Sequence, residues 1–297
     1  MITDRLSKEK PKISHKIVNE KAITTHQTSS FNLNNSTVRS YNHFNRTPLH
    51  IAAQTHNEKA IRYLITCHAD GNVRDVNNQV ALELALLSNA PQLIIDLLMN
   101  STKVLKVMKK CLNNFSINDC RNVIYKLSKM GVNFNLRNRK NLTPIMIAAQ
   151  FGDTDLLREL IKLAQSGKTE GLEAKDENLH TALHCACSWG HLECVKILLD
   201  NGADFEAKDN QSNTPLARAS QWGRHEIVEL LLNKGANANA ISGFNKAPIE
   251  LAFTKGISNC NSPHWECIDL LIPFSDFSRL LFCKSSNIND RLSFYAR

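Results

Sequence analysis

The chain has 297 residues, of which 42% are hydrophobic and 22% are charged, a balance typical of globular domains. Its apolar runs, such as Leu93 to Ile95, are far shorter than the roughly 20 residues of a membrane-spanning helix, and its Lys-rich start is unlike a secretory signal. The nine cysteines are scattered and form no CxxC pair. This pattern predicts reduced thiols and a cytoplasmic protein, with the nucleus as the alternative.

Residues 1–41 are basic and rich in Lys, Ser, Thr and Asn, and they predict a disordered tail because they hold too few apolar residues for a core. A short motif then recurs along the chain. It reads TPLHIAA from Thr47, VALELA from Val80, TPIMIAA from Thr143, TALHCAC from Thr181, TPLARAS from Thr214 and APIELA from Ala247. The last three copies are 33 residues apart, which predicts a stack of structural repeats.

Each copy of the motif has the residue types of a helix start. Thr caps the helix, Pro is tolerated in its first turn, and Leu and Ala follow at helical spacing. In the copy at 181, Gly190 then turns the chain. A second helix with Val195 and Leu198 on one face ends near Gly202, as a glycine often ends a helix. Such a helix pair cannot bury its apolar face alone, so the pairs must stack.

The motif and its period resemble those of the ankyrin-repeat family over about residues 42–273. The resemblance implies an all-α solenoid of about seven helix-turn-helix units with hairpin-like loops. The predicted units are near 42–74, 75–104, 105–137, 138–175, 176–208, 209–241 and 242–273. The third unit departs most from the family, because Asn114 and Phe115 stand where small residues are usual. Residues 274–297 predict a capping helix and tail, since an apolar end face must be covered.

Two predicted units are longer than 33 residues. The fourth adds five residues around Gln165 to Thr169, after its second helix, and the seventh adds seven residues, Ile257 to Pro263, between its helices. Insertions in repeat proteins usually lie in surface loops, so both are expected there.

A metal site and an enzyme activity are both considered and not predicted. The candidate metal ligands are His184, Cys185, Cys187, His191 and Cys194. Cys185 and Cys187 are two positions apart on a helix and diverge by roughly 200°, whereas metal ligands must converge. The resemblance implies a structural role for His184. No nucleophile elbow, P-loop, dinucleotide loop or HExxH pair occurs in the sequence, so no catalytic residue and no cofactor are predicted.

The resemblance implies that a partner docks on the concave face, which comprises the loop tips and the exposed side of the first helices. The residue before the inter-helix glycine lies there, and in three successive units it is Phe151, Trp189 and Trp222. These rings are predicted to form a ladder of anchors. The polar residues of the predicted partner-binding set are Gln150, Ser188, Gln221, Asn178, His180, Gln211 and Asn213. The alternative is that the rings only pack on the adjacent repeat.

Residues 101–140 carry ten basic side chains and one acidic side chain. The basic ones are Lys103, Lys106, Lys109, Lys110, Arg121, Lys126, Lys129, Arg137, Arg139 and Lys140. This density of positive charge predicts binding of an acidic protein segment or of anionic lipid. Nucleic acid is the last choice, because no nucleic-acid-binding module accompanies the block. The alternative is a solvated helix surface.

Together these features predict a non-enzymatic scaffold that binds a protein partner on the concave surface of the repeats. The alternative is a regulatory adaptor, or a host-directed effector, that joins the repeat-bound partner to a second factor through its tails. Truncation of each tail separates the two, because the second function of an adaptor lies outside the repeats.

Overall fold

The computed structural model describes residues 42–116, 118–256 and 263–276, and the regular structure within these ranges is helical. The predicted tail at 1–41, the first six residues of the predicted insertion at 257–263 and most of the predicted cap, 277–297, lie outside the described residues. None of the helices in the described ranges combines the length and the hydropathy needed to cross a bilayer.

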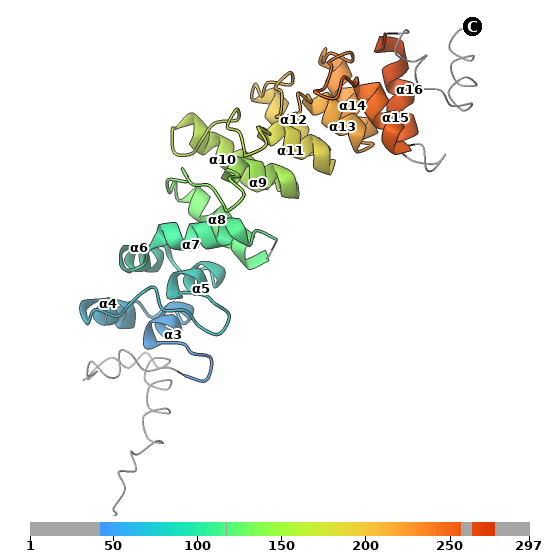
Figure 1. Cartoon of the computed structure of the whole chain (residues 1–297). Helices are drawn as coiled ribbons and strands as arrows, with labels where there is room; N and C mark the ends of the chain where they lie inside the picture. The colour runs from blue at the N-terminus through green and yellow to red at the C-terminus, as the bar shows by residue number, and fades with distance from the viewer. Residues whose placement is uncertain (1–41, 117, 257–262, 277–297) are drawn as a thin grey trace, which may run out of the picture. The chain divides into compact units, whose positions relative to one another are not determined.

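The helices follow one another in pairs along the chain (Figure 1). The pairs are α3 (Pro48–Gln54) and α4 (Glu58–Thr66), α5 (Ala81–Leu87) and α6 (Gln92–Ser101), α7 (Val104–Asn113) and α8 (Asn118–Lys129), α9 (Pro144–Phe151) and α10 (Thr154–Gln165), α11 (Ala182–Trp189) and α12 (Leu192–Asp200), α13 (Pro215–Gln221) and α14 (His225–Asn233), and α15 (Pro248–Gly256) and α16 (His264–Leu271). A 3-10 turn, η1 (Ile272–Phe274), follows the last pair. Each pair is called a repeat below, numbered from one to seven.

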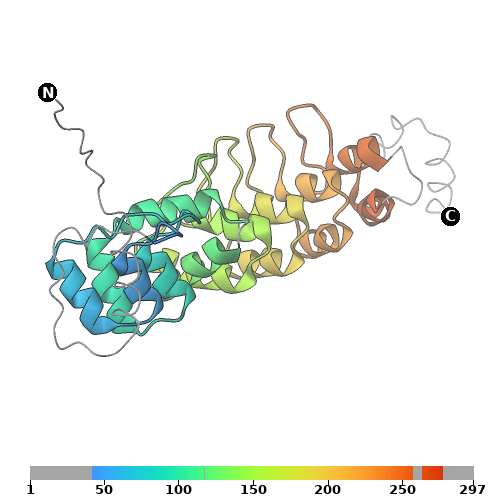
Figure 2. The same ribbon diagram turned by 90° about the horizontal axis from the view of Figure 1, so that it is seen from below.

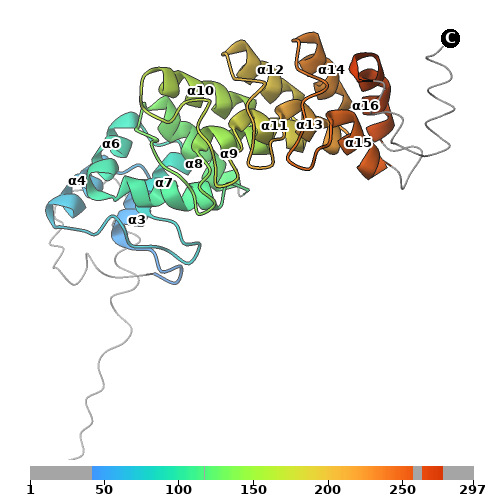
Figure 3. The same cartoon turned by 45° about the horizontal axis from the view of Figure 1, so that its top comes forward.

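The chain divides into two compact parts, and the division falls inside α8. The N-terminal part ends at Lys126 and the C-terminal part begins at Leu127. In the C-terminal part, α9, α11, α13 and α15 contact one another in that order and form a layer of first helices. The second helices α10, α12, α14 and α16 form the other layer (Figure 3). The loops that precede α11, α13 and α15 project side by side from this part (Figure 2).

The first helices begin as the motif predicts. Pro48, Pro144 and Pro215 each occupy a first helical position, where a missing N–H is tolerated. The hydroxyl oxygen of Thr143 accepts the backbone N–H of Met146 at 3.3 Å, which satisfies one of the free amides at the start of α9.

A glycine between the two helices of a repeat makes room for the next repeat. Gly152 has a φ of +73°, and a Cβ added to it would lie 2.5 Å from Nδ1 of His191. The other ring nitrogen of His191 donates to the carbonyl oxygen of Gln150 at 3.0 Å. The same arrangement places the ring of His264 against Gly223. Each such histidine therefore fastens its repeat to the backbone of the preceding one.

The insertion in the fourth repeat differs from its prediction. Helix α10 has 12 residues, whereas α12 and α14 have 9. Three of the five added residues therefore lengthen the helix, and only the other two lie in the loop before Asp176. The reason is that Leu163 continues the apolar stripe of α10 and is buried, so burial favours helix over loop at this point.

The hairpin-like loop predicted between repeats is missing at one junction. Only two residues separate the end of α6 at Ser101 from the start of α7 at Val104. In repeats one and five, a first-helix histidine bonds the following loop: Nε2 of His50 donates to the carbonyl oxygen of Gln79 at 3.1 Å. Repeat two has no following loop, and the equivalent residue is Glu83.

Glu83 compensates for this missing loop with an ion pair. Its carboxylate is buried and lies 2.9 Å from the ammonium of Lys110 on α7. The same carboxylate accepts the backbone N–H of Val80 at the start of α5. Lys110 also donates to the carbonyl oxygen of Asn78. The ion pair thus joins repeats two and three, as His50 and His184 join repeats one and five to the loops that follow them.

Candidate functional site

A groove with a volume of 470 Å³ lies on the C-terminal part and is lined by residues of repeats four, five and six. Its walls come from the loops before α9 and α11, from the first helices α9, α11 and α13, and from the turn after α13. Six of the ten predicted partner-binding residues line it: Gln150, Asn178, His180, Ser188, Trp189 and Trp222. The groove thus gathers residues that are more than 70 positions apart in sequence.

The three predicted aromatic anchors are all exposed. Phe151, Trp189 and Trp222 keep 40%, 57% and 49% of their surface accessible. Trp189 and Trp222 line the groove, whereas Phe151 lies outside its lining. With this much of each ring in contact with solvent, packing on the adjacent repeat leaves a large aromatic surface for other contacts.

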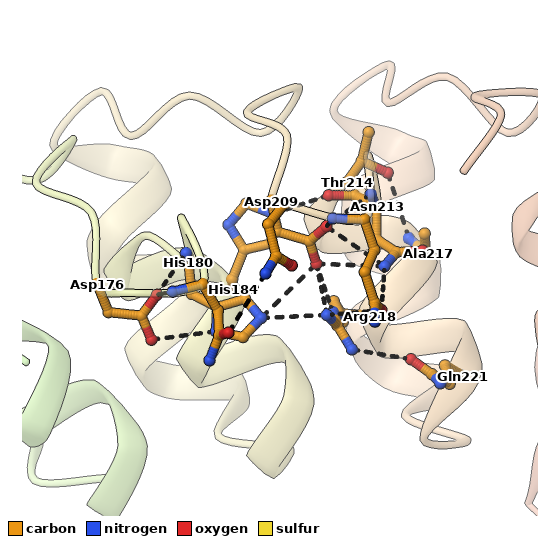
Figure 4. A network of polar contacts seen from close by, with 12 residues as sticks. Asp176, His180, His184, Asp209, Asn213, Thr214, Ala217, Arg218 and Gln221 are labelled. Atoms are coloured by element: carbon orange, nitrogen blue, oxygen red, sulfur yellow. Dashed lines mark hydrogen bonds and ion pairs between the residues drawn. The ribbon is translucent and has the colours of Figure 1, made fainter. Parts of the chain in front are cut away.

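A buried carboxylate, Asp209, holds the loop before α13 (Figure 4). One of its oxygens accepts the backbone N–H groups of Gln211 and Asn213 at 2.8 and 2.9 Å. Its other oxygen accepts Nε of Arg218, on α13, at 2.7 Å. Burial acts to raise the pKa of Asp209, but the N–H of Asn213 and the charge of Arg218 outweigh it and the pKa is lowered. Asp209 therefore stays ionised and fixes Arg218 at the groove.

His180 links this cluster to the preceding repeat. A guanidinium N–H of Arg218 lies 3.1 Å from Nε2 of His180, and Nδ1 of His180 lies 3.2 Å from a carboxylate oxygen of Asp176. A guanidinium can only donate, so Nε2 accepts and Nδ1 carries the proton that it donates to Asp176. Asp176, His180, Arg218 and Asp209 form one chain of polar contacts along the groove (Figure 4).

Three predicted contact residues belong to this cluster rather than to the groove lining. Asn213 is 3% exposed, and its side-chain amide donates to Asp209 at 3.2 Å. A partner cannot reach this amide, so its role is to hold the loop, which corrects the expected surface position. Gln221 is half-buried and accepts from Arg218 at 3.2 Å, whereas Gln211 is exposed at the loop tip.

The cysteine and histidine cluster is buried and internally bonded. Nδ1 of His184 accepts the backbone N–H of Thr181, and Nε2 donates to the carbonyl oxygen of Asn213 at 3.0 Å. Burial raises the pKa of Cys185 to about 12 and also raises that of Cys187. Within the described ranges, no group of three His, Cys, Asp or Glu side chains is placed to hold a metal ion.

The buried histidine gives a prediction for pH dependence. Burial lowers the pKa of His184 to about 4, whereas an unfolded His has a pKa of about 6.5. The unfolded chain therefore binds more protons between these values, and stability is lost as the pH falls through them. The loss at His184 approaches about 3 kcal/mol. The measurement is urea unfolding of the C-terminal part between about pH 7 and 4.

The control for this prediction is a matched pair of variants. His184→Asn removes the buried ring and should flatten the pH profile, although the variant is less stable throughout. His43→Gln, at an exposed position, should leave the slope unchanged. A His184→Asn profile as steep as that of the wild type would show that other groups cause the acid sensitivity.

The predicted basic block is divided between the two parts, and only some of it faces solvent. In the N-terminal part, Lys103, Lys106 and Lys109 are exposed. Lys110 is held by Glu83, as described above. Lys126 donates to the carbonyl oxygen of Leu86, and burial lowers its pKa. Burial and internal bonds thus remove two of these lysines from the accessible charge.

The remaining residues of the block show the same mixture. The guanidinium of Arg121 lies 5.8 Å from the ring centre of Phe115. Arg137 pairs with Glu170, and this hydrogen bond raises its pKa. The exposed basic residues of the C-terminal part of the block are Lys129, Arg139 and Lys140, of which Lys140 lines the groove.

Four groove residues were missed by the sequence reasoning: Leu142, Glu177, Arg218 and Arg224. For Arg218 the sequence did contain a signal. Repeats one, four and five have the apolar residues Ile51, Ile147 and Cys185 at its position. An arginine at an apolar position of a repeat indicates a specific polar partner, which for Arg218 is the buried Asp209.

The sequence matches the family model described as ankyrin repeats (3 copies) over residues 18–108, 112–209 and 170–242, which together cover more than half of the chain. Proteins of this family generally mediate protein–protein interactions and are typically non-enzymatic. The helix pairs seen in both parts confirm the predicted all-α repeat fold. The chain belongs to the ankyrin-repeat family.

Proposed function

We propose that the chain is a non-enzymatic scaffold that holds a segment of a protein partner in the groove of repeats four to six. The observation that carries the proposal is the pair of exposed tryptophans, Trp189 and Trp222, on the lining of one groove. Both stand at the end of a first helix in successive repeats. Tryptophan is the residue type most enriched among binding hot spots.

The surroundings of the two rings support this use. Arg218 is fixed by Asp209, and His180 is fixed by Arg218 and Asp176, so the polar groups beside the rings are held in place before a partner arrives. Preorganised groups lose little entropy on binding. The exposed lysines at the start and on the surface of α7, Lys103, Lys106 and Lys109, would steer a partner with an acidic segment toward the protein.

The test is loss of binding in the double variant Trp189→Ala/Trp222→Ala. A partner is first identified by affinity capture with mass spectrometry and then titrated against the purified full chain. We expect the double variant to bind at least about 100-fold more weakly, because each truncated hot spot loses about 2 kcal/mol or more.

The matched control is Phe244→Ala. Phe244 is 67% exposed in the loop before α15 and does not line the groove. The Phe244→Ala variant should bind the partner as tightly as the wild type does. Circular dichroism should show unchanged helix content in all variants. If the tryptophan variant binds as tightly as Phe244→Ala, the groove is not the binding site.

A further inference from the structure

The repeats provide an internal comparison for each position of the groove. Two residues before the cap of each first helix, outside repeat three, the backbone has a positive φ between 54° and 60°. The residues at this position are Asn45, Asn78, Asn141, Leu179, Ser212 and Asn245. This backbone conformation disfavours residues with a Cβ, and Asn tolerates it best after Gly.

Leu179 is therefore an exception among these loop residues. Its φ is +57°, and its side chain is 45% exposed. A left-handed backbone at a non-Gly residue is unfavourable, and an exposed Leu gains little from burial. The fold thus gives no reason for Leu at this position. Its two neighbours, Asn178 and His180, both line the groove.

Arg224, beside the same groove, differs from the histidines that two other repeats have at its position. Repeats five and seven have His191 and His264 at this position, and their rings donate to backbone carbonyls at 3.0 and 3.1 Å. Arg224 makes the equivalent bond to the carbonyl of Ser188 with Nε, at 3.4 Å. The arginine therefore makes a longer contact than the histidines and leaves its terminal N–H groups for other use.

The charge of Arg224 is not balanced locally. Its guanidinium lies against Gly190, next to Trp189. Arg218, the other arginine of the lining, is paired with Asp209 at 2.6 Å. In the part of the chain that the structure describes, Arg224 has no carboxylate within ion-pair distance. A carboxylate from a partner would complete it, since guanidinium groups bind carboxylates through paired hydrogen bonds.

The other end of the groove differs in character. Lys140, Asp176 and Glu177 line it in the loops before α9 and α11, so this end has no excess of positive charge for a second carboxylate of the partner. Leu179 lies between the lining residues Asn178 and His180 and is exposed beside this end, outside the groove lining itself. The two ends are separated by at least the length of α11, which is about 12 Å for its residues. An extended chain spans this distance in about four residues.

We propose that the groove accepts an extended acidic segment of a partner protein, with an Asp or Glu carboxylate on Arg224 and an apolar side chain on Leu179. The two contact residues of the segment lie at least about four positions apart. This inference rests on the proposed function and specifies the partner's chemistry. Leu179 stands where Asn suits the backbone better, and Arg224 makes a longer backbone contact than the histidines of repeats five and seven; a binding site would gain from both residues.

The test uses variants that restore the residue of the other repeats. They are Leu179→Asn and Arg224→His, and the matched control is Ser212→Asn, at the same loop position in the next repeat. The probe is a displayed random library of peptides about twelve residues long, which can span α11 in extended form. Selection is done on the wild-type full chain, and the selected peptides are then titrated against each variant.

The wild type should select peptides with an Asp or Glu about four or more positions from a Leu, Ile, Phe or Trp. Arg224→His should weaken their binding by about tenfold or more, and Leu179→Asn by about fivefold. Leu179→Asn should also raise the Tm by about 2 °C, because the left-handed backbone suits Asn. Ser212→Asn should leave affinity unchanged.

The outcomes separate this inference from the proposed function. Selected peptides that lack acidic residues, or that bind both restoring variants as tightly as the wild type, overturn the inference. The proposed function still stands in that case if Trp189→Ala/Trp222→Ala abolishes their binding. A fall in Tm for Leu179→Asn also overturns the inference, since Leu179 would then stabilise the folded repeat. If the tryptophan variant retains the peptides, both proposals fail.

Discussion

Replacement of Lys110 by Met is expected to destabilise the N-terminal part by about 3 to 5 kcal/mol. The carboxylate of Glu83 is 3% exposed and lies 2.9 Å from the Lys110 ammonium. Without this cation the carboxylate remains buried and uncompensated, and burial of an unpaired charge is among the largest single-residue penalties known in folded proteins.

The measurement must report on the N-terminal part alone. The three tryptophans of the chain, Trp189, Trp222 and Trp265, lie in the C-terminal part, so fluorescence would follow the wrong part. Hydrogen exchange of the amides in α5 and α7 reports on the correct one, because protection falls as the free energy of opening falls. We expect faster exchange in these helices and little change in α11 and α13.

Two further variants control this prediction. Lys106→Met removes an exposed lysine from the same helix and should change stability by less than about 0.5 kcal/mol. The double variant Lys110→Met/Glu83→Leu replaces the whole ion pair by apolar groups and should recover much of the loss. If Lys110→Met proves as mild as Lys106→Met, the ion pair does not hold the loop-free junction together.

Replacement of Asp209 by Ala is expected to destabilise the C-terminal part by about 3 to 5 kcal/mol. The side chain is fully buried and accepts hydrogen bonds from the backbone of Gln211, from the backbone and side chain of Asn213, and from Arg218. Its removal leaves buried donors without partners and one arginine without its counter-charge.

Urea unfolding followed by tryptophan fluorescence measures this effect directly, because Trp222 lies on the same repeat as Asp209. Asp200→Ala is the control, since this carboxylate is 70% exposed and only 3.9 Å from Lys234, and such pairs contribute little. Asp209→Asn keeps the size of the side chain but loses its charge. Its free energy of unfolding should lie between those of Asp209→Ala and Asp200→Ala. An Asp209→Ala variant as stable as Asp200→Ala would contradict the role given to this carboxylate.

The sequence was sufficient to predict the helices because the motif fixes them locally. Thr143 and Pro144 start a helix, and Gly152 ends it, through interactions within one repeat. The 33-residue spacing then predicts the stack, because neighbouring repeats bury the same faces. The predicted aromatic positions follow from this register. Trp189 and Trp222 line one groove because they hold equivalent places in adjacent repeats.

Residues whose polar partner is not part of the motif were predicted less well. Lys110 was counted with the exposed basic block, but the absent loop after α6 lets it reach Glu83. Asn213 was expected at a loop tip, but Asp209 draws its side chain inward. Arg218 was overlooked because its position was read as part of an apolar motif. In each case the motif does not specify the residue with which the side chain makes its main polar contact.

The contacts of His191 and His264 have a consequence for how such a chain can change length. Each imidazole packs against a glycine of the preceding repeat and donates a hydrogen bond to a main-chain carbonyl of that repeat. Any repeat with an inter-helix glycine has both of these features. Whole repeats of the C-terminal part can therefore be duplicated, deleted or exchanged without loss of these joints. The junction of α5 and α7 is different, because Glu83 accepts only a neighbour that carries a lysine at the place of Lys110. That junction fixes the order of its two repeats, whereas the histidine contacts by themselves do not.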